Sequence, residues 1–324
     1  MLHTLGLLKS RTLVLLSGEG TTIPAAEARA LFLAYDPDSQ FESPEPRVLI
    51  ADSQADPLRV ESRIAFARRV GRLVEDRSQL ADYLNGRRMR FRCFNLGRGP
   101  RPEPGDYLDG LRVEVDLEAP ECELTLVRGE RDYAAVTMPG RMVQGWSGRR
   151  PRLRPFFHPS AIFPKFSRAL VNLSRCKEGD VFLDPFSGTG SILLEAYLVG
   201  ATVVAMDVSE QMVRGGKRNM EHFCQEWAGT VRADSTFPPV RGIGASATDI
   251  PYGRASSTRG KRPEEILRLL LGPMSEAMVP RSLLVLMHPQ SVPVPRSAGF
   301  SLVEEHHLHV HKLLTRTVTV LERR

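Results

Sequence analysis

A glycine-rich turn at residues 184–191, with the sequence DPFSGTGS, constrains the fold of this chain more than any other stretch. It follows the apolar run GDVFL and precedes ILLEAYLVG, so it joins a predicted strand to a predicted helix. Gly188 and Gly190 let a ligand approach the backbone, and the N–H groups at the start of the helix face that ligand. The unit therefore predicts a nucleotide-type ligand at the edge of an α/β sheet.

Three classes of ligand compete for this turn. A P-loop requires a lysine and a hydroxyl residue after its last glycine, and no such pair follows Gly190. A dinucleotide fingerprint requires a third glycine for close packing of helix on strand, and Leu193 occupies that position, which weakens this alternative. S-adenosylmethionine remains as the cofactor that the turn is expected to hold.

Three acidic residues at successive predicted strand ends favour this cofactor. Asp184 precedes the turn and can receive the ammonium group of the methionine moiety, directly or through water. Asp207 ends the next strand, where an acid can accept both ribose hydroxyls, and Asp234 follows the third strand, where it can take the adenine amino group. Each alone has a structural alternative, such as a helix cap. Their combination favours the cofactor site.

The fourth predicted strand of this region ends in TDIPYGRAS, a segment suited to amine methylation. An exocyclic base amine is a poor nucleophile, because its lone pair is delocalised into the ring. The carboxylate of Asp249 and the carbonyl of Ile250 can accept its two N–H bonds and aim the lone pair at a sulfonium methyl group. Pro251 restricts the turn, and Tyr252 offers a face for a flipped base. The alternative is a plain β-turn with an Asx interaction. Beside the predicted cofactor we favour the catalytic interpretation, which requires no metal.

The rhythm of strands and helices changes near residue 156. Beyond it, strands alternate with helices, which predicts a doubly wound α/β sheet with a mainly parallel core and two antiparallel strands at its end. Before it, strand candidates such as RTLVLLSG and RMRFRCFNLG lack this rhythm, which predicts an α+β region. An amphipathic helix is expected within residues 57–76, PLRVESRIAFARRVGRLVED.

Basic residues gather between residues 141 and 154, in a chain of net charge +6. No acid interrupts them, and guanidinium groups match phosphate oxygens two bonds at a time. Taken alone, the stretch slightly favours a solvated interdomain linker, but in a basic chain a polyanionic partner becomes a hypothesis worth testing. The candidate RNA-binding residues are Arg141, Arg149, Arg150, Arg152 and Arg154.

Several other classes of protein are disfavoured. The four cysteines form no CxxC pair, so neither a zinc site nor a disulfide framework is expected. His307, His309 and His311 alternate along a predicted strand and are interpreted as a surface patch rather than a metal site. No apolar run approaches the ~20 residues that span a bilayer, and the first residues lack the order of a signal peptide. We expect a cytoplasmic monomer with no membrane partner.

The chain resembles the THUMP-domain tRNA guanine-N2 methyltransferase family over nearly its whole length, and most of all the archaeal branch that methylates the guanosine at position 10. The resemblance is most specific over residues 152–255, in the segments RPFFHPSAIFPKFSRALVNLS, FLDPFSGTGSILLEA and DIPYGRAS. It is looser in LVLLSGEGTTIPAAEARALF and VDLEAPECELTLV, and it returns in the tail VHKLLTRTVTVLE.

This resemblance implies a domain organisation and an activity. A ferredoxin-like domain at residues 1–72 and a THUMP domain at 73–138 would hold the tRNA acceptor end. A basic linker at 139–155 would lead to a Rossmann-like class I methyltransferase domain at 156–324. That domain would transfer a methyl group from S-adenosylmethionine to the exocyclic N2 amine of a guanosine in tRNA.

The resemblance also implies two sets of site residues. The cofactor-binding set is Phe157, His158, Pro159, Asp184, Phe186, Gly188, Thr189, Gly190, Asp207, Val208, Ala233 and Asp234. The catalytic set is Asp249, Ile250, Pro251 and Tyr252. One residue departs from the family, which usually has Asp-Pro-Pro-Tyr. Ile250 keeps the carbonyl but not the preset φ of proline, and we expect activity to persist.

Other functions fit the same residues. The enzyme could methylate another guanosine of tRNA, an adenine in DNA or a protein amide, because the same motif serves all of these amines. A non-enzymatic alternative is an RNA-binding protein with a vestigial cofactor site, which Ile250 makes worth testing.

Overall fold

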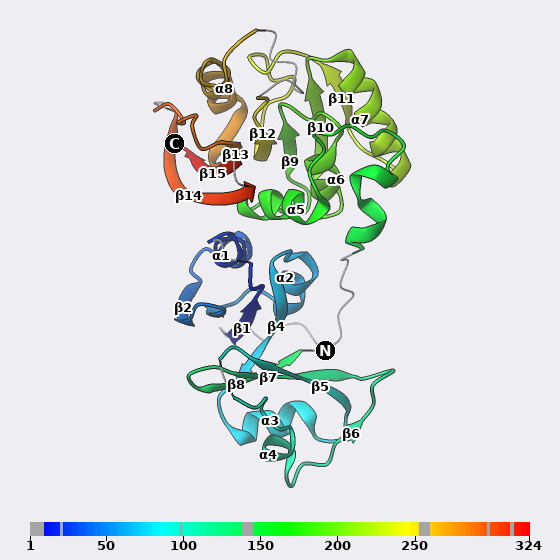
Figure 1. Ribbon diagram of the computed structural model, residues 1–324, viewed down its shortest axis with the longest axis vertical. Helices are drawn as coiled ribbons and strands as arrows, with labels where there is room; N and C mark the ends of the chain where they lie inside the picture. The colour runs from blue at the N-terminus through cyan, green and yellow to red at the C-terminus, as the bar shows by residue number, and fades with distance from the viewer. Residues whose placement is uncertain are drawn as a thin grey trace, which may run out of the picture. The chain divides into compact units, whose positions relative to one another are not determined.

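The computed structural model describes residues 10–19, 22–97, 99–137, 145–252, 260–296, 299–311 and 314–324. The chain divides into two compact units, the first formed by residues 1–20 and 24–144 and the second by residues 21–23 and 145–324, and each unit has its own sheet (Figure 1). Within the described ranges, no helix combines the length and apolar character needed to cross a membrane.

The first unit contains a single eight-stranded sheet in the order β2-β3-β1-β4-β8-β7-β5-β6. Its elements are β1 (Ser10–Leu16), α1 (Ile23–Tyr35), β2 (Gln40–Glu45), β3 (Val48–Ser53), α2 (Pro57–Arg63), β4 (Ala67–Val74), α3 (Arg77–Leu84), β5 (Arg88–Asn95), α4 (Gly105–Leu108), β6 (Glu114–Val115), β7 (Cys122–Arg128) and β8 (Asp132–Thr137). Neighbouring strands are antiparallel, except that β5 runs parallel to both β7 and β6. Apolar side chains of α1 and α2 form one core with β1, β3 and β4.

The helix expected within residues 57–76 covers only the first part of that segment. It ends at Arg63, because the backbone turns to an extended conformation at Ile64. The buried carboxylate of Glu27 then accepts hydrogen bonds from the backbone N–H groups of Ala65 and Phe66, both at 2.8 Å. The following residues form β4, which joins β1 to β8 in the middle of the sheet. A helix within this segment is therefore confirmed, and the second part of the segment forms a strand.

The second unit has a seven-stranded sheet in the order β11-β10-β9-β12-β13-β15-β14. Its elements are the 3-10 turns η1 (Trp146–Arg149) and η2 (Pro151–Leu153), then α5 (Pro164–Leu173), β9 (Val181–Asp184), α6 (Ser191–Tyr197), β10 (Thr202–Asp207), α7 (Glu210–Phe223), β11 (Gly229–Arg232), β12 (Ile243–Asp249), α8 (Pro263–Ala277), β13 (Met278–Pro289), β14 (Phe300–His311) and β15 (Leu314–Arg323). The strands from β9 to β13 are parallel, and β15 is antiparallel to both of its neighbours. The predicted parallel core and antiparallel end are confirmed.

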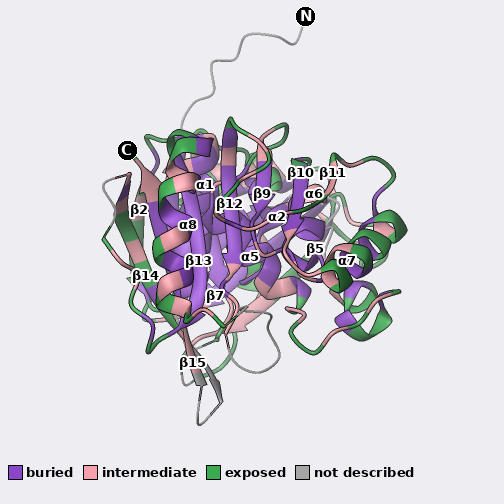
Figure 2. Cartoon of the chain, turned by 90° about the horizontal axis from the view of Figure 1, so that it is seen from above, coloured by how far each residue is buried: buried purple, intermediate pink, exposed green. Residues whose placement is uncertain are grey.

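One hydrophobic core cluster of this unit lies between α8 and the middle of the sheet. Figure 2 shows the central strands β9, β12 and β13 buried, and α8 with an exposed side and a buried side. Leu267, Leu270 and Met274 of α8 join the apolar side chains of β12 and β13 in one cluster. The central strands are therefore covered by packed side chains, and their carboxyl ends are held in fixed positions.

Two of the arginines predicted to bind RNA are buried in the second unit. Arg149 donates from Nε to Oε1 of the fully buried Glu195 at 2.8 Å. Arg154 donates from Nη1 to Ser191 Oγ at 2.6 Å. The prediction that Arg149 and Arg154 contact RNA is therefore wrong, because both side chains are buried and their polar groups bind α6.

Residues 145–155 of the predicted linker are consequently packed on the second unit. Arg150 and Arg152 lie between the two buried arginines in the sequence and are exposed, so they keep their candidate role. Arg141 lies outside the described residues.

Candidate active site

The glycine-rich turn follows β9 as predicted and bends through two left-handed residues. Gly188 has a φ of 49° and Gly190 a φ of 79°, a region that residues with a Cβ rarely adopt. Gly190 donates its backbone N–H to Ser187 O at 2.7 Å and is the N-cap residue of α6. The turn is thus tightly closed, and it leads directly into the helix.

Helix α7 packs against the backbone of the glycine-rich turn through Gly216 and Asn219, which were not predicted from the sequence. A Cβ on Gly216 would lie 2.6 Å from Gly188 O, so only glycine lets the helix come this close. Asn219 donates from Nδ2 to Thr189 O and to Phe156 O, both at 2.9 Å, and accepts from Phe156 N at 2.8 Å. One side chain therefore ties the turn to the segment before α5. The two adjacent glycines in RGGK were the sequence signal that could have indicated this close approach of the helix.

Asp184 ends β9 and lies almost completely buried at 2% exposure. One oxygen, Oδ1, accepts from Thr248 Oγ1 at 2.6 Å and from Phe186 N at 3.1 Å. Burial raises the pKa of this carboxyl to about 7, opposed by the hydrogen bonds from Thr248 and Phe186 and supported by Asp207 and Asp249. A cationic ligand group would favour its ionised form.

Asp207 ends β10 and faces the turn. Its Oδ2 accepts from Gly188 N at 2.9 Å, and its Oδ1 accepts from Ser209 N at 2.8 Å. Burial raises the pKa of this carboxyl, and the backbone N–H groups act in the opposite direction. Since each carboxylate oxygen can accept two hydrogen bonds, both retain capacity for a ligand hydroxyl.

Asp234 lies two residues beyond the end of β11. Its Oδ1 accepts from Thr236 N at 3.1 Å and from Thr236 Oγ1 at 3.0 Å. Its Oδ2 lies 3.8 Å from Lys261 Nζ. Asp234 is thus oriented by a short turn, in the position beyond strand three where the sequence placed it.

Asp249 ends β12, and its side chain is 19% exposed. Its Oδ2 lies 3.3 Å from Nη1 of Arg316 on β15, and the carbon of that guanidinium lies 5.4 Å from the centroid of the Tyr252 ring. Oδ1 is buried and has no hydrogen-bond partner among the described residues. Burial raises the pKa of Asp249 to about 7, and Arg316 opposes that shift. The sequence reasoning did not identify Arg316.

Ile250 shows why a residue other than proline is accommodated in this turn. Its backbone N–H donates to Met287 O on the neighbouring strand β13 at 2.9 Å, a bond that proline cannot make. Its side chain is fully buried in the core below α8. This hydrogen bond and the packing of the side chain fix the backbone at Ile250, as the restricted φ of a proline would do.

These residues meet at one cavity of about 420 Å³ at the carboxyl edge of the sheet. It is lined by His158, Pro159, Asp184, Phe186, Gly188, Thr189, Asp207, Val208, Ala233, Asp234, Asp249, Ile250, Pro251, Tyr252, Lys261 and Arg316, among others. All four predicted catalytic residues are in this lining. Of the predicted cofactor residues, only Phe157 and Gly190 are not: Phe157 is 46% exposed and Gly190 lies buried at the start of α6.

Known proteins resemble this chain in sequence. A family model described as the RMKL-like methyltransferase domain matches residues 151–315. The tRNA (guanine(10)-N2)-dimethyltransferase of Methanothermobacter thermautotrophicus is 29% identical over 335 residues, covering 96% of this chain and 99% of the relative. The enzyme of the same name from Pyrococcus abyssi is 31% identical over 227 residues, covering 68% of each chain.

The fold is also similar to a solved structure. The crystal structure of TrmN from Thermus thermophilus aligns with a TM-score of 0.51 at 19% identity, and the alignment covers 97% of this chain and 100% of that one. At this identity the likeness concerns the fold alone.

Proposed function

The chain belongs to the tRNA (guanine(10)-N2)-methyltransferase family, and on this premise we propose that Asp249 and Tyr252 hold the N2 amine of a guanosine for methylation. The chain is an S-adenosylmethionine-dependent enzyme that methylates a guanine N2 amine in tRNA. The observation that carries the proposal is the buried Oδ1 of Asp249, which lacks a partner among the described residues and lies at the end of a strand beside the cavity. The position in tRNA would be 10, as in the names of the relatives.

The described residues fit this cofactor. Asp184 would face the ammonium group, Asp207 the ribose hydroxyls and Asp234 the adenine amine. Gly188 lets the backbone come close, because no Cβ stands between the turn and the cavity. The three acids follow the neighbouring strands β9, β10 and β11, which supports this order of cofactor groups. Because β9 pairs with β12, the methionine end of the cofactor would be the end nearest to Asp249.

Asp249 acts on the amine in this proposal. Its Oδ1 and the carbonyl of Ile250 accept the two N–H bonds of N2, so the nitrogen lone pair is directed away from them. The methyl group comes from S-adenosylmethionine: the bond from N2 to carbon forms as the carbon–sulfur bond breaks, S-adenosylhomocysteine leaves, and N2 loses one proton. Asp249 Oδ1, which already accepts that N–H, can take the proton and release it to water.

We extend the proposal to two successive transfers, the reaction named for the archaeal relatives. After one methylation N2 still carries one N–H, which Asp249 Oδ1 can accept in the same geometry. Mass spectrometry of nucleosides from a position-mapped tRNA fragment would show both the site and the number of methyl groups. Methyl groups on DNA but not on tRNA would contradict the proposed substrate, and cofactor binding without transfer would support the RNA-binding alternative.

Asp207→Ala is expected to weaken binding of S-adenosylmethionine by about 2–4 kcal/mol, because two charge-assisted hydrogen bonds to the ribose are lost. Isothermal titration calorimetry measures this directly. Asp207→Asn should lose less, since its amide oxygen can still accept.

The matched control for Asp207 is Glu210→Ala. Glu210 is also acidic and close in sequence, but it is exposed and forms ion pairs with Arg214 and Arg232 outside the cavity. The affinity of the Glu210→Ala variant for S-adenosylmethionine should equal that of the wild type. If Asp207→Ala binds as tightly as the control, Asp207 is not part of the cofactor site.

We further propose that the first unit combines a ferredoxin-like part, residues 1–72, with a THUMP part, residues 73–138. The strand order β2-β3-β1-β4, with α1 and α2 packed on these strands, supports the first assignment. The border lies within β4, so both parts share one sheet. A cytoplasmic monomer remains our expectation.

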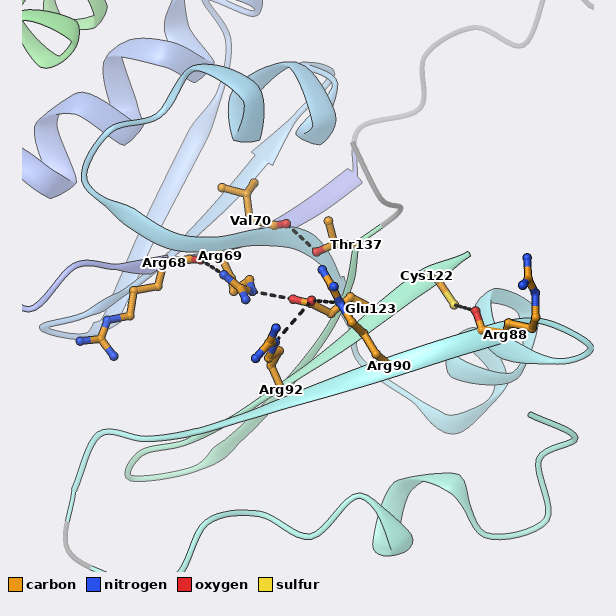
Figure 3. A network of polar contacts seen from close by, with 9 residues as sticks. All are labelled: Arg68, Arg69, Val70, Arg88, Arg90, Arg92, Cys122, Glu123 and Thr137. Carbon is orange, nitrogen blue, oxygen red and sulfur yellow. Dashed lines mark hydrogen bonds and ion pairs between the residues drawn. The ribbon is translucent and has the colours of Figure 1, made fainter. Parts of the chain in front are cut away.

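The first unit presents an arginine-rich groove that we propose contacts the tRNA backbone. It is lined by Ala67, Arg68, Arg69, Phe91, Arg92, Cys93, Phe94 and Arg101. Glu123 binds Arg69 at 2.5 Å and Arg90 at 2.6 Å, and it lies 3.8 Å from Arg92, whereas Figure 3 shows Arg68 directed away from this acid. More basic than acidic groups thus remain at the groove, and phosphate oxygens would neutralise them.

Replacing Arg68, Arg92 and Arg101 together by Gln should weaken tRNA binding and reduce the slope of log affinity against log salt by about two to three units, since each phosphate contact contributes close to one. Filter binding over a salt series measures the slope. The control is Arg241→Gln, because Arg241 is exposed at the opposite end of β12 from the active site. A double Gln variant of Arg150 and Arg152 tests the sequence-based candidates separately. An unchanged slope in the triple variant would mean that the groove does not contact tRNA.

A further inference from the structure

Arg316 lies at the active-site cavity but comes from β15, the antiparallel strand of the sheet. It is opposite Pro289 of β13 in the strand register, and its side chain is 21% exposed. Nη1 lies 3.3 Å from Asp249 Oδ2 and 3.6 Å from Met287 Sδ. The guanidinium also covers the ring of Tyr252 at 5.4 Å. One side chain therefore contacts both polar members of the catalytic turn.

The contact with Arg316 makes the two carboxylate oxygens of Asp249 different. Oδ2 faces Arg316, whereas Oδ1 is buried without a hydrogen-bond partner among the described residues. A buried acceptor left unpaired costs about 1–3 kcal/mol, which a ligand N–H would recover. Because Arg316 binds only Oδ2, it leaves Oδ1 to the amine.

We propose that Arg316 is the positioning residue of this reaction: it favours the ionised form of Asp249, turns Oδ1 toward the target amine and supports one face of the Tyr252 ring so that the other face receives the base. This inference rests on the proposed function, since it assumes that Asp249 accepts the amine. It assigns to the tail strand a role in chemistry beyond closing the sheet.

The charged groups around Asp249 explain why a cation is needed there. Asp249 and Asp184 on β9 are both buried, and Asp249 raises the pKa of Asp184, because two buried carboxylates repel. Tyr252 is neutral at physiological pH, since burial raises its pKa further. Lys261 also lines the cavity, but its ion pair is with Asp234. Among the described residues, Arg316 is thus the cation paired with Asp249.

The ionised carboxylate is the active form, so the rate rises with pH through the pKa of Asp249. Burial already raises that pKa to about 7 while Arg316 lowers it. Removing the cation raises the pKa further and moves the rising limb of the pH–rate profile to higher pH.

The test compares Arg316→Gln and Arg316→Lys in single-turnover methyl transfer, with saturating tRNA and cofactor, between pH 6 and 9. Arg316→Gln should move the rising limb up by about one to three pH units, the usual effect of losing an opposite charge at this distance. Near neutral pH it should be at least about tenfold slower, with most of the loss recovered at high pH. Arg316→Lys should keep the limb near its original place, because the charge remains.

A double variant isolates the partner. In an Asp249→Asn background the carboxylate no longer titrates, so the rising limb should be absent and adding Arg316→Gln should leave the pH dependence of the rate unchanged. A shift that persists there would mean that Arg316 acts on another group and would overturn the proposal. Arg316→Met, which keeps an apolar stem beside Met287, repeats the comparison if the Gln variant does not fold.

Two controls separate positioning from a merely structural role. Arg323→Gln alters another arginine of β15 that does not line the cavity, and its profile should match the wild type. Cofactor affinity of Arg316→Gln by calorimetry should be unchanged. If Arg316→Gln slows the reaction equally at every pH, the inference fails while the assignment of Asp249 stands. If Asp249→Ala itself retains the wild-type rate, the proposed function fails first.

Discussion

Asp249→Ala lowers the single-turnover rate of methyl transfer by roughly two to four powers of ten, the expected loss when one positioned polar group is removed from the transition state. The reason is Oδ1, which has no hydrogen-bond partner among the described residues and in the proposal localises the lone pair of the amine. Affinity for S-adenosylmethionine and for tRNA should remain nearly intact, because in the proposal the reacting amine is the part of the two substrates that Asp249 binds. Rapid-quench assays with saturating tRNA report this step alone.

The conservative variant sharpens this prediction. Asp249→Asn should be milder than Asp249→Ala, since an amide oxygen can still accept one N–H. The matched control is Asp180→Asn, at the amino end of β9 and away from the cavity. A near-native rate for Asp249→Ala would show that DIPYG is only a turn.

Glu195→Ala is expected to destabilise the second unit by about 3–5 kcal/mol, because it leaves two buried arginines without their counter-charge. Glu195 is fully buried and lies 2.8 Å from Arg149 Nε and 2.8 Å from Arg168 Nη2. Both guanidinium groups also lie over the ring of Trp146, at 5.2 and 5.9 Å. The expected loss is thus that of a whole buried cluster.

Urea unfolding followed by tryptophan fluorescence measures this loss. The chain has two tryptophans, Trp146 and Trp227, and both belong to the second unit. The control is Glu221→Ala, which removes an exposed ion pair with Lys217 and should cost well under 1 kcal/mol. Equal midpoints for the two variants would mean that the buried cluster does not stabilise the unit.

Features encoded by neighbouring residues were predictable. Asp184, Asp207 and Asp249 each follow an apolar run, and a polar residue there marks the carboxyl end of a strand. In a parallel sheet such ends meet at one edge, so the sequence placed these acids together, and all line the cavity. The assignment of roles to them remains a prediction.

Features that depend on distant partners were not predictable in this way. Arginine density between residues 141 and 154 indicated a solvated, phosphate-binding stretch. Glu195, the acid that pairs with the buried Arg149, lies 46 residues away in α6. No local sequence pattern distinguishes a paired arginine from an unpaired one. Likewise, the segment that became β4 has an amphipathic pattern, but pairing with β1 and β8 overrides it.

By itself, the sequence determined the local units: the strand–turn–helix around Gly188 and Gly190, the acids at the strand ends and the alternating order that produces a parallel core. These follow from short-range periodicity and backbone conformation, which a few neighbouring residues specify. The tertiary structure alone decided which side chains share a partner. Arg316 reaches Asp249 across 67 positions because β15 pairs antiparallel with β13, which lies beside β12, and this register places a partly buried cation next to the carboxylate.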